Sequence, residues 1–267
     1  MIFLFKYLTG ADAQKQKEIP SDGKPDPAAS EQIFFAAQTI QNACGTQALL
    51  SVLLNQDDKI NIGPTLKEFK DFTGLLPPDL RGECLSNSEQ IRDTHNGFAR
   101  SSPFVSEEQR MATEDDELYH FIAYTPINGI LYELDGLNAA PISHGACSFE
   151  EFPEKVIPVV QRRMQRFPLG EIRFNLIAMI RDPRVQAREI GDQETLHREK
   201  RKRAEWMWEN ALRRHNFVGF TGELLKAVVS RKVKEGGYGE WVNEAKERTR
   251  KRVEDRRQKG HDSGDED

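Results

Sequence analysis

The sequence predicts an α+β fold with a central antiparallel sheet, flanking helices and a helical C-terminal extension. The strongest hairpin signal is Asn128-Gly129, which separates two apolar segments of β character. A helix-periodic apolar pattern begins at Cys44, and from Arg188 the chain becomes helical and highly charged. These three observations give the sheet, the flanking helices and the extension their places along the chain.

Four segments are expected to be strands. Residues 2–5 are an apolar strand almost at the start of the chain. Residues 120–126 and 130–134 form the two arms of the hairpin. Residues 171–180 alternate between polar and apolar at first and are fully apolar later, which predicts a further strand.

Three helices are expected to flank the sheet. The first begins at Cys44 and is buried for about three turns, because its apolar residues keep helical spacing. The second begins at Ser86, where Glu89 completes a capping box, and ends at Gly97. The third follows a capping box over residues 148–151 and is expected to bend at its two prolines.

Length and composition exclude several classes of protein. The 267 residues allow one substantial core and an accessory segment. No apolar run reaches the roughly 18–20 residues of a membrane span, and the opening residues lack a signal-peptide cleavage site. Three widely spaced cysteines, Cys44, Cys84 and Cys147, form neither a disulfide framework nor a zinc motif. We expect a soluble intracellular protein in a reducing compartment.

Charge is distributed unevenly along the chain. The net charge is −5, yet residues 1–196 carry 19 basic and 29 acidic side chains, and residues 197–259 carry 19 basic and 10 acidic. An acidic front and a basic rear predict two modules with different partners. Two polar stretches of the front, 9–31 and 101–117, are expected to be loops, and the second holds six acids and one Arg.

Cys44 is the first candidate for chemistry. It lies where an extended approach meets the N-terminus of a buried helix. Free amides and the positive end of the helix dipole stabilise a thiolate there and lower the pKa of the thiol. The alternative is a small buried core residue, which is the commoner fate of a lone cysteine.

The hairpin supplies a second candidate pair. His120 begins its first strand, and Asp135 follows its second. A four-residue loop, 126–129, places the two directly opposite each other, whereas the tighter Asn128-Gly129 turn places them diagonally. Both registers put the side chains on one face, as a carboxylate that orients a histidine base requires. The alternative is a salt bridge on an exposed strand pair.

The remaining candidates are weaker. Gln38, six residues before Cys44, could donate its amide to an oxyanion, although a solvent-facing Gln fits the spacing better. His95 is expected on a helix surface, and His144 lies in a turn region with no carboxylate at short spacing. Cys84 and Cys147 are interpreted as structural thiols. No nucleotide-binding motif or metal-ligand cluster is present, so no cofactor or metal is expected.

Together these residues resemble a known family, the ubiquitin C-terminal hydrolase (UCH) family of cysteine proteases. The resemblance rests on Gln38, on NACGTQALLSVLLN at 42–55, on HFIAY at 120–124 and on ELDGL at 133–137. It covers residues 1 to about 183 and implies a papain-like layered fold. It also implies the roles of four residues, namely Cys44 as nucleophile, His120 as general base and then acid, Asp135 as the orienting carboxylate and Gln38 as oxyanion stabiliser.

The same resemblance implies how the substrate reaches the site. Residues 101–117 correspond to a crossover loop, through which the ubiquitin tail would pass. The six acids of this loop match a tail that bears arginines, and a solvated charged loop is the alternative. The implied activity is hydrolysis of the bond after the last glycine of ubiquitin.

The rear of the chain resembles the C-terminal extension of the proteasome-associated members. Residues 209–217 and 223–226 carry this likeness, which a much longer chromatin-associated deubiquitinase shares. The implied partner is a proteasomal ubiquitin receptor, with a chromatin-remodelling complex as a second. The expected division is a catalytic domain over 1–184, a charged helical linker over 185–205, a docking extension over 206–247 and a disordered tail over 248–267.

The start of the chain departs from the family pattern. Family members carry tens of residues, including a first helix, before the strand that here follows Met1. Either the sequence is a fragment that starts late, or the catalytic domain does without that helix. An alternative function follows from its absence: a catalytically impaired module that binds ubiquitin or the proteasome without turnover.

Basic runs in the rear allow a third interpretation. REKRKR at 198–203 and RTRKR at 248–252 could bind nucleic acid or direct nuclear import. Interleaved Glu residues and the lack of aromatic stacking residues favour solvated faces or a partner surface instead. Cytoplasmic and nuclear localisation is expected, without membrane association.

Overall fold

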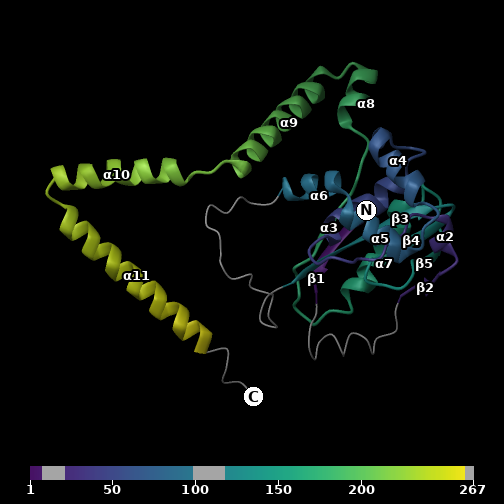
Figure 1. Cartoon of the computed structure of the whole chain (residues 1–267), viewed down its shortest axis with the longest axis horizontal. Helices are drawn as coiled ribbons and strands as arrows, with labels where there is room; N and C mark the ends of the chain where they lie inside the picture. The colour runs from purple at the N-terminus through teal and green to yellow at the C-terminus, as the bar shows by residue number, and fades with distance from the viewer. Residues whose placement is uncertain (8–21, 99–117, 262–267) are drawn as a thin grey trace. The chain divides into compact units, whose positions relative to one another are not determined.

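A computed structural model describes residues 1–7, 22–98 and 118–261 (Figure 1). The chain divides into two compact units, one reaching from Met1 to Trp208 and one beginning at Glu209. The predicted loop at 101–117 and residues 9–21 of the other predicted loop lie outside the described residues.

The first unit is built on a six-stranded antiparallel sheet, which confirms the predicted α+β class. Its strand order is β2-β5-β4-β3-β1-β6. The strands are β1 (Ile2–Lys6), β2 (Lys24–Pro25), β3 (Tyr119–Ile127), β4 (Ile130–Leu134), β5 (Ile142–Ala146) and β6 (Asn175–Ile177). β1, at the start of the chain, lies between β3 and β6 and pairs with both, so distant parts of the first unit meet in one sheet.

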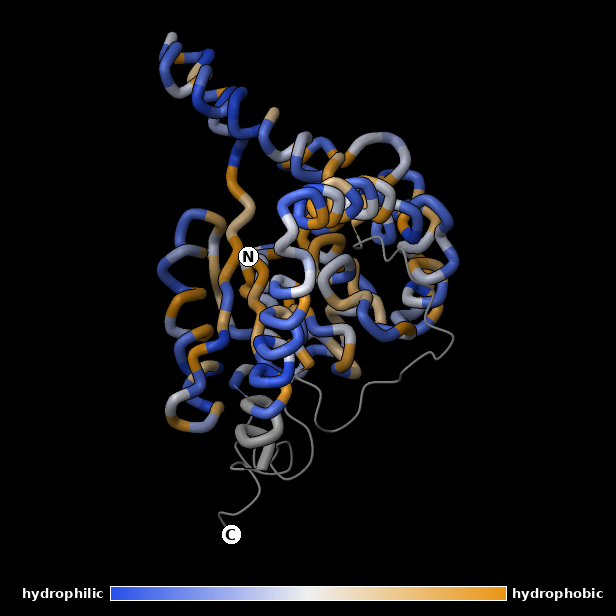
Figure 2. The backbone as a smooth tube through the Cα atoms, turned by 90° about the vertical axis from the view of Figure 1, so that its left-hand side faces the viewer, coloured by the Kyte–Doolittle hydropathy of each residue, from blue (hydrophilic) through white to orange (hydrophobic). Residues whose placement is uncertain are grey.

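Helices cover the sheet and extend beyond it. Those of the first unit are α2 (Ala29–Gln32), α3 (Cys44–Leu54), α4 (Gly63–Thr73), α5 (Pro78–Asn87), α6 (Glu89–Asn96), α7 (Phe152–Met164), α8 (Pro183–Ile190) and α9 (Gln193–Arg214), whose last turns pass into the second unit. The second unit continues with α10 (Val218–Lys234) and α11 (Tyr238–His261). In Figure 2 the tube of β1, beside the N label, is coloured hydrophobic.

Different helices pack on the two faces of the sheet. On one face, α3 packs on strand residues such as Ile2 and Ala123. On the other face, α7 packs on residues such as Phe3 and Ile122. Since successive residues of a strand point to opposite faces, His120 falls on the α7 face together with Ile122.

Several predicted element boundaries are wrong for local reasons. The second predicted helix begins at Glu89, not Ser86, because Ser86 belongs to α5 and the Ser88 hydroxyl caps α6 by accepting from the Ile91 amide at 3.4 Å. Neither α4 nor α5 was predicted. The predicted strand over 171–180 is reduced to β6, because only those residues pair with β1.

Two further predictions about irregular segments need correction. Part of the loop predicted over 9–31 is ordered structure, since β2 pairs with β5 and α2 begins at Ala29. Part of the tail predicted to be disordered over 248–267 is helical, since α11 continues to His261.

The predicted boundary at 184 falls inside the first unit, because Ala187 and Leu196 of α8 and α9 are buried.

No helix within the described ranges is long and apolar enough to cross a membrane.

Candidate active site

Cys44 is the first residue of α3, as the sequence predicts. Asn42, two residues earlier, has a positive φ of 63°, which turns the chain sharply from its extended approach into the helix. The helix then buries Ala48, Val52 and Leu54, and its first turn holds Cys44 at 9% exposure. The thiol therefore lies at the positive end of the helix dipole, where free backbone amides favour a thiolate.

The hairpin joins His120 to Asp135. Its turn is the tight form, because Asn128 and Gly129 both have positive φ and Ala123 pairs with Leu134. His120 and Asp135 are therefore diagonal neighbours, and the imidazole Nε2 lies 2.7 Å from the carboxylate Oδ1. Both side chains are buried, so this contact is not the exposed salt bridge that the sequence left as an alternative.

Electrostatics couple Cys44 to His120. Burial opposes the thiolate, but the hydrogen bond to His120, backbone amides of Phe121 and Gly45, and the imidazolium charge outweigh it, so the pKa of Cys44 is lowered. Burial also opposes the imidazolium, yet Asp135 and Cys44 together raise the pKa of His120 to about 9. Near neutral pH this arrangement favours a thiolate–imidazolium pair, which is a strong nucleophile beside a proton donor.

Gln38 is anchored beside the same centre. Its backbone amide donates to the carbonyl of Gly136 at 2.8 Å, directly after Asp135 in the chain. Its side-chain amide donates to the Ile40 carbonyl at 3.1 Å. A Cβ on Gly136 would lie 2.1 Å from Nε2 of the Gln47 side chain and 3.0 Å from the Gln38 backbone nitrogen. Only glycine fits there.

The approach to Cys44 is held by α5, which sequence reasoning missed. Arg81 is 3% exposed and donates to the carbonyls of Ser30, Ile33 and Phe35 from one nitrogen, at 2.9, 2.8 and 3.2 Å. Its other nitrogens donate to the carbonyls of Thr73 and Gly74. The sequence offered no signal for this role. The partners of Arg81 are backbone carbonyls, which every residue carries, so no pattern of side chains marks them.

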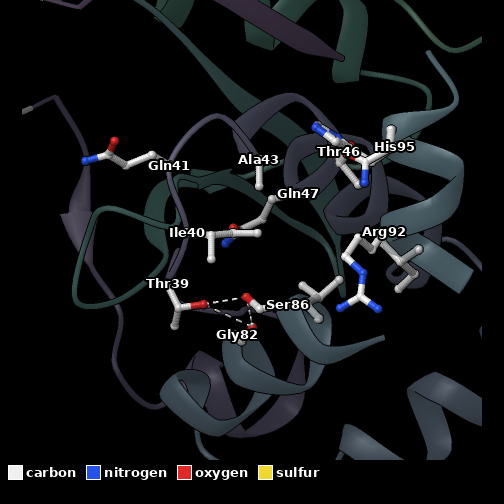
Figure 3. A pocket seen from close by; sticks show the side chains of 13 residues that line it. Thr39, Ile40, Gln41, Ala43, Thr46, Gln47, Gly82, Ser86, Arg92 and His95 are labelled. Atoms are coloured by element: carbon white, nitrogen blue, oxygen red, sulfur yellow. Dashed lines mark hydrogen bonds between the residues drawn. The ribbon is translucent and has the colours of Figure 1, made fainter. Parts of the chain in front are cut away.

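A cavity of roughly 200 Å³ lies on the flank of the α3 N-terminus (Figure 3). Ala43 and Thr46, on either side of Cys44 in the chain, form part of its wall. The Thr46 hydroxyl lies 2.7 Å from Nδ1 of His95 on α6, so this exposed histidine braces the first turn of α3. Thr39 and Ser86 face each other across the lower edge, with their hydroxyl oxygens 2.6 Å apart.

His144 was interpreted wrongly as a turn residue, and its carboxylate partners lie outside the short sequence spacing that was considered. It lies on β5, and its side chain contacts Glu133 Oε2 at 3.3 Å and Asp22 Oδ2 at 3.8 Å. Sequence spacing could not reveal these contacts, because they depend on the pairing of β5 with β4 and on residue 22, far away in the chain.

The other cysteines take no part in this centre. All three cysteines are free thiols; Cys147 is buried and donates to the Ser148 carbonyl, and Cys84 is half-buried on α5. Burial raises the pKa of Cys147, in contrast to Cys44. Within residues 1–7, 22–98 and 118–261, no three His, Cys, Asp or Glu side chains are placed to hold a metal ion.

Comparison with known families identifies the class of protein. A family model described as "Ubiquitin carboxyl-terminal hydrolase, family 1" matches residues 1–165, and one described as "Ubiquitin carboxyl-terminal hydrolases" matches residues 192–233. The chain belongs to the ubiquitin carboxyl-terminal hydrolase family, whose members are cysteine peptidases. The resemblance drawn from Gln38, Cys44, His120 and Asp135 is confirmed at the level of the family.

Individual relatives agree with this assignment. Ubiquitin carboxyl-terminal hydrolase 2 of Schizosaccharomyces pombe is 50% identical over 252 residues, covering 92% of this chain and 82% of that protein. Isozyme L5 of Dictyostelium discoideum is 41% identical over 71% of this chain and 51% of its own. The structure of Trichinella spiralis UCH37 bound to ubiquitin vinyl methyl ester has a TM-score of 0.56 and 32% identity, covering 79% and 80% of the two chains.

Proposed function

We propose that this protein is a deubiquitinating enzyme whose reaction centre is Cys44, His120 and Asp135. The observation that carries the proposal is the buried 2.7 Å hydrogen bond between His120 and Asp135, together with the interaction of His120 with Cys44 that lowers the Cys44 pKa and raises the His120 pKa. The substrate is ubiquitin or a ubiquitin conjugate. Support comes from the Trichinella spiralis UCH37 structure, whose ligand is a ubiquitin vinyl methyl ester.

The chemistry proceeds in two halves. The Cys44 thiolate attacks the carbonyl carbon of the last glycine of ubiquitin and forms a carbon–sulfur bond. As the carbon–nitrogen bond breaks, protonated His120 gives its proton to the leaving amine, and a thioester remains. His120 then takes a proton from water, which attacks the thioester and releases free ubiquitin and the thiolate. Asp135 keeps the imidazole oriented and stabilises its charge throughout.

Gln38 is proposed to stabilise the oxyanion of both tetrahedral intermediates. Its backbone amide donates a hydrogen bond to the Gly136 carbonyl, and its side chain projects from the segment that leads to Cys44. The side chain would exchange its Ile40 carbonyl partner for the developing oxyanion. Such a donor contributes roughly 10²–10³-fold in rate in well-measured acyl-transfer enzymes.

A ubiquitin probe with a C-terminal electrophile tests this proposal on the full chain. We expect a covalent adduct with the wild type and none with Cys44→Ala, whereas Cys84→Ala, a half-buried thiol outside the centre, reacts normally. A ubiquitin reporter bearing a fluorescent leaving amine measures turnover. Binding of ubiquitin without adduct or turnover would instead favour the impaired binding module, and an adduct on Cys44→Ala would overturn the assigned nucleophile.

We further propose that the C-terminal unit docks on a proteasomal ubiquitin receptor, with a chromatin-remodelling complex as a second partner, in the cytoplasm and nucleus. Supporting this, α10 exposes apolar side chains at near-helical spacing, which a monomeric helix would leave in water. They are Phe220, Leu224 and Leu225, at 66%, 52% and 54% exposure, preceded by the N-cap residue Phe217 at 42%.

Calorimetry with purified receptor tests the docking proposal. Phe220→Ser combined with Leu224→Ser is expected to weaken binding at least about tenfold, since buried aromatic and aliphatic anchors dominate such interfaces. The matched control is Glu223→Ser, an exposed polar residue on the same helix. Equal affinity of the double variant and the control would refute the docking surface.

A further inference from the structure

A buried ion pair lies on the same face of the sheet as the proposed catalytic histidine. Glu133 of β4 is 2% exposed and accepts from Nη1 of Arg163 of α7 at 2.8 Å. The Tyr124 hydroxyl donates to the other carboxylate oxygen at 3.0 Å, and His144 Nε2 lies 3.3 Å from it. Burial opposes the Glu133 carboxylate, but His144, Arg163 and Tyr124 outweigh it and lower the pKa of this carboxyl.

Arg163 reaches the catalytic centre through one aromatic ring. Its guanidinium carbon lies 5.0 Å from the centroid of the Phe5 ring, within the range of a cation–π contact. Phe5 lies directly opposite His120 in the pairing of β1 with β3. The two rings meet edge to face, with centroids 5.7 Å apart and planes at 82°. The cation, the benzene ring and the imidazole therefore form one continuous series of contacts.

Asp135 also acts on Arg163 by charge. Burial opposes the guanidinium cation, but the charges of Glu133 and Asp135 favour it, so the pKa of Arg163 is raised. Arg163 therefore keeps its positive charge on the face of the sheet that carries His120. The titratable and charged groups facing Arg163 are Glu133 on β4, Asp135 after it, Tyr124 on β3 and Arg166 in the chain after α7, while His144 and Asp22 complete the network around Glu133.

Fold stability alone gives little reason for this pair. Burying two charges costs desolvation, and apolar residues of similar volume often stabilise a core equally well. Its neighbour on the helix, Arg162, is 50% exposed and pairs with Asp22 at 2.9 Å, which is the ordinary use of an arginine on this helix. Arg162 and Arg163 carry the same guanidinium group, but Arg162 faces solvent and Arg163 faces the buried Glu133 and Phe5.

We propose that Arg163, held by Glu133, is a positioning residue for the reaction: it fixes the Phe5 ring against His120 and supplies buried positive charge on the face of the sheet that carries this histidine. This role rests on the proposed Cys44–His120–Asp135 centre. It predicts that the Glu133–Arg163 pair tunes the proton affinity of the centre, in addition to shaping the core.

The test compares Arg163→Met with Arg162→Met in the full-length enzyme. The measurements are kcat and KM for the ubiquitin reporter, and the rate of Cys44 alkylation, both as functions of pH. Arg163→Met removes the cation beside the Glu133 carboxylate, which keeps Tyr124 and His144, so both limbs of each pH profile should move to higher pH by about half a unit or more. We expect kcat to fall about tenfold with KM within about twofold, since the interaction supports the transition state.

Further variants separate the electrostatic role from packing. Phe5→Leu removes the ring but no charge, so it should lower kcat without moving the limbs. Arg163→Lys keeps the charge and should hold the limbs in place, even if Arg163→Met fails to fold. Two outcomes would overturn the role of Arg163. One is a shift of the pH-profile limbs in Arg163→Lys; the other is a folded Arg163→Met whose pH profile and kcat equal those of Arg162→Met. Absence of any Cys44 adduct in the wild type would instead overturn the proposed function itself.

Discussion

His120 Nε2 lies 2.7 Å from Asp135 Oδ1, although the two residues are diagonal and not directly opposed in the hairpin. The diagonal follows from the tight Asn128-Gly129 turn, in which both residues adopt positive φ. Asp135 also accepts from the backbone amide of Leu137 at 3.0 Å, which fixes the carboxylate after the strand has ended. With Nε2 bound to Asp135, Nδ1 is the ring nitrogen left to face Cys44.

Asp135→Asn tests the orienting role of this carboxylate. The amide has nearly the same shape but no charge, so it holds the imidazolium less well and permits the wrong ring orientation. We expect kcat to fall by about 10²–10⁴-fold, by comparison with the equivalent change in serine proteases. Reporter hydrolysis measures the effect, and unfolding by urea checks that the fold is kept. Asp26→Asn, which affects a carboxylate that accepts from Tyr132, serves as the control; an equally small effect of both changes would contradict the role.

The pH dependence of Cys44 alkylation tests the ion pair. The Cys44 pKa is lowered and the His120 pKa is raised to about 9, so the thiolate–imidazolium pair should persist across neutral pH. Alkylation should therefore proceed at pH values below the ordinary pKa of a cysteine thiol. Turnover should decline as pH rises through about 9, where His120 loses the proton that the leaving amine needs.

His120→Ala provides the comparison for the pH experiment. Burial of Cys44 is then opposed only by the backbone amides of Phe121 and Gly45, so its pKa should rise and alkylation near neutral pH should slow by about tenfold or more. The acid limb should move to higher pH in the same variant. Identical alkylation profiles in wild type and His120→Ala would rule out the coupling between the two residues.

Gly82→Ala tests the close packing of α5 against the segment that leads to Cys44. A Cβ at this position would lie 2.0 Å from the Ala37 carbonyl oxygen and 3.1 Å from the Thr39 side chain. Since the obstacle is backbone, the two segments must separate, and we expect a loss of about 1–3 kcal/mol in the free energy of unfolding. Urea denaturation measures it, and the exposed neighbour Glu83→Ala should change stability by less than about 0.5 kcal/mol.

Arg81→Met tests the clamp on the same segment. The change keeps an apolar stem but removes the Arg81 donor from the carbonyls of Ser30, Ile33, Phe35 and Gly74, and from that of Thr73, which keeps the Leu76 amide. We expect a loss on the order of 3 kcal/mol or more in the free energy of unfolding, because buried acceptors then lack partners. Arg92→Met, on the exposed side of α6, should be nearly neutral. A loss of the same size in both variants would show that the clamp is unimportant.

The sequence contained enough local information for the elements around the site. The Asn128-Gly129 turn, the helix starting at Cys44 and the Ser148–Glu151 capping box are signals carried by adjacent residues, and each is present in the structure. Where two local signals competed, as at Ser86 and Ser88, the choice depended on where the preceding helix ended.

By itself, therefore, the sequence determined the fold class, the family and the candidates Cys44, His120, Asp135 and Gln38, because periodicity, turn chemistry and motif order are properties of neighbouring residues. Only the tertiary structure decided which turn the hairpin takes, that His144 and Arg163 meet Glu133, and that Arg81 holds the approach to Cys44. These contacts join residues far apart in the chain, and they arise from strand pairing and helix docking, for which no local pattern exists.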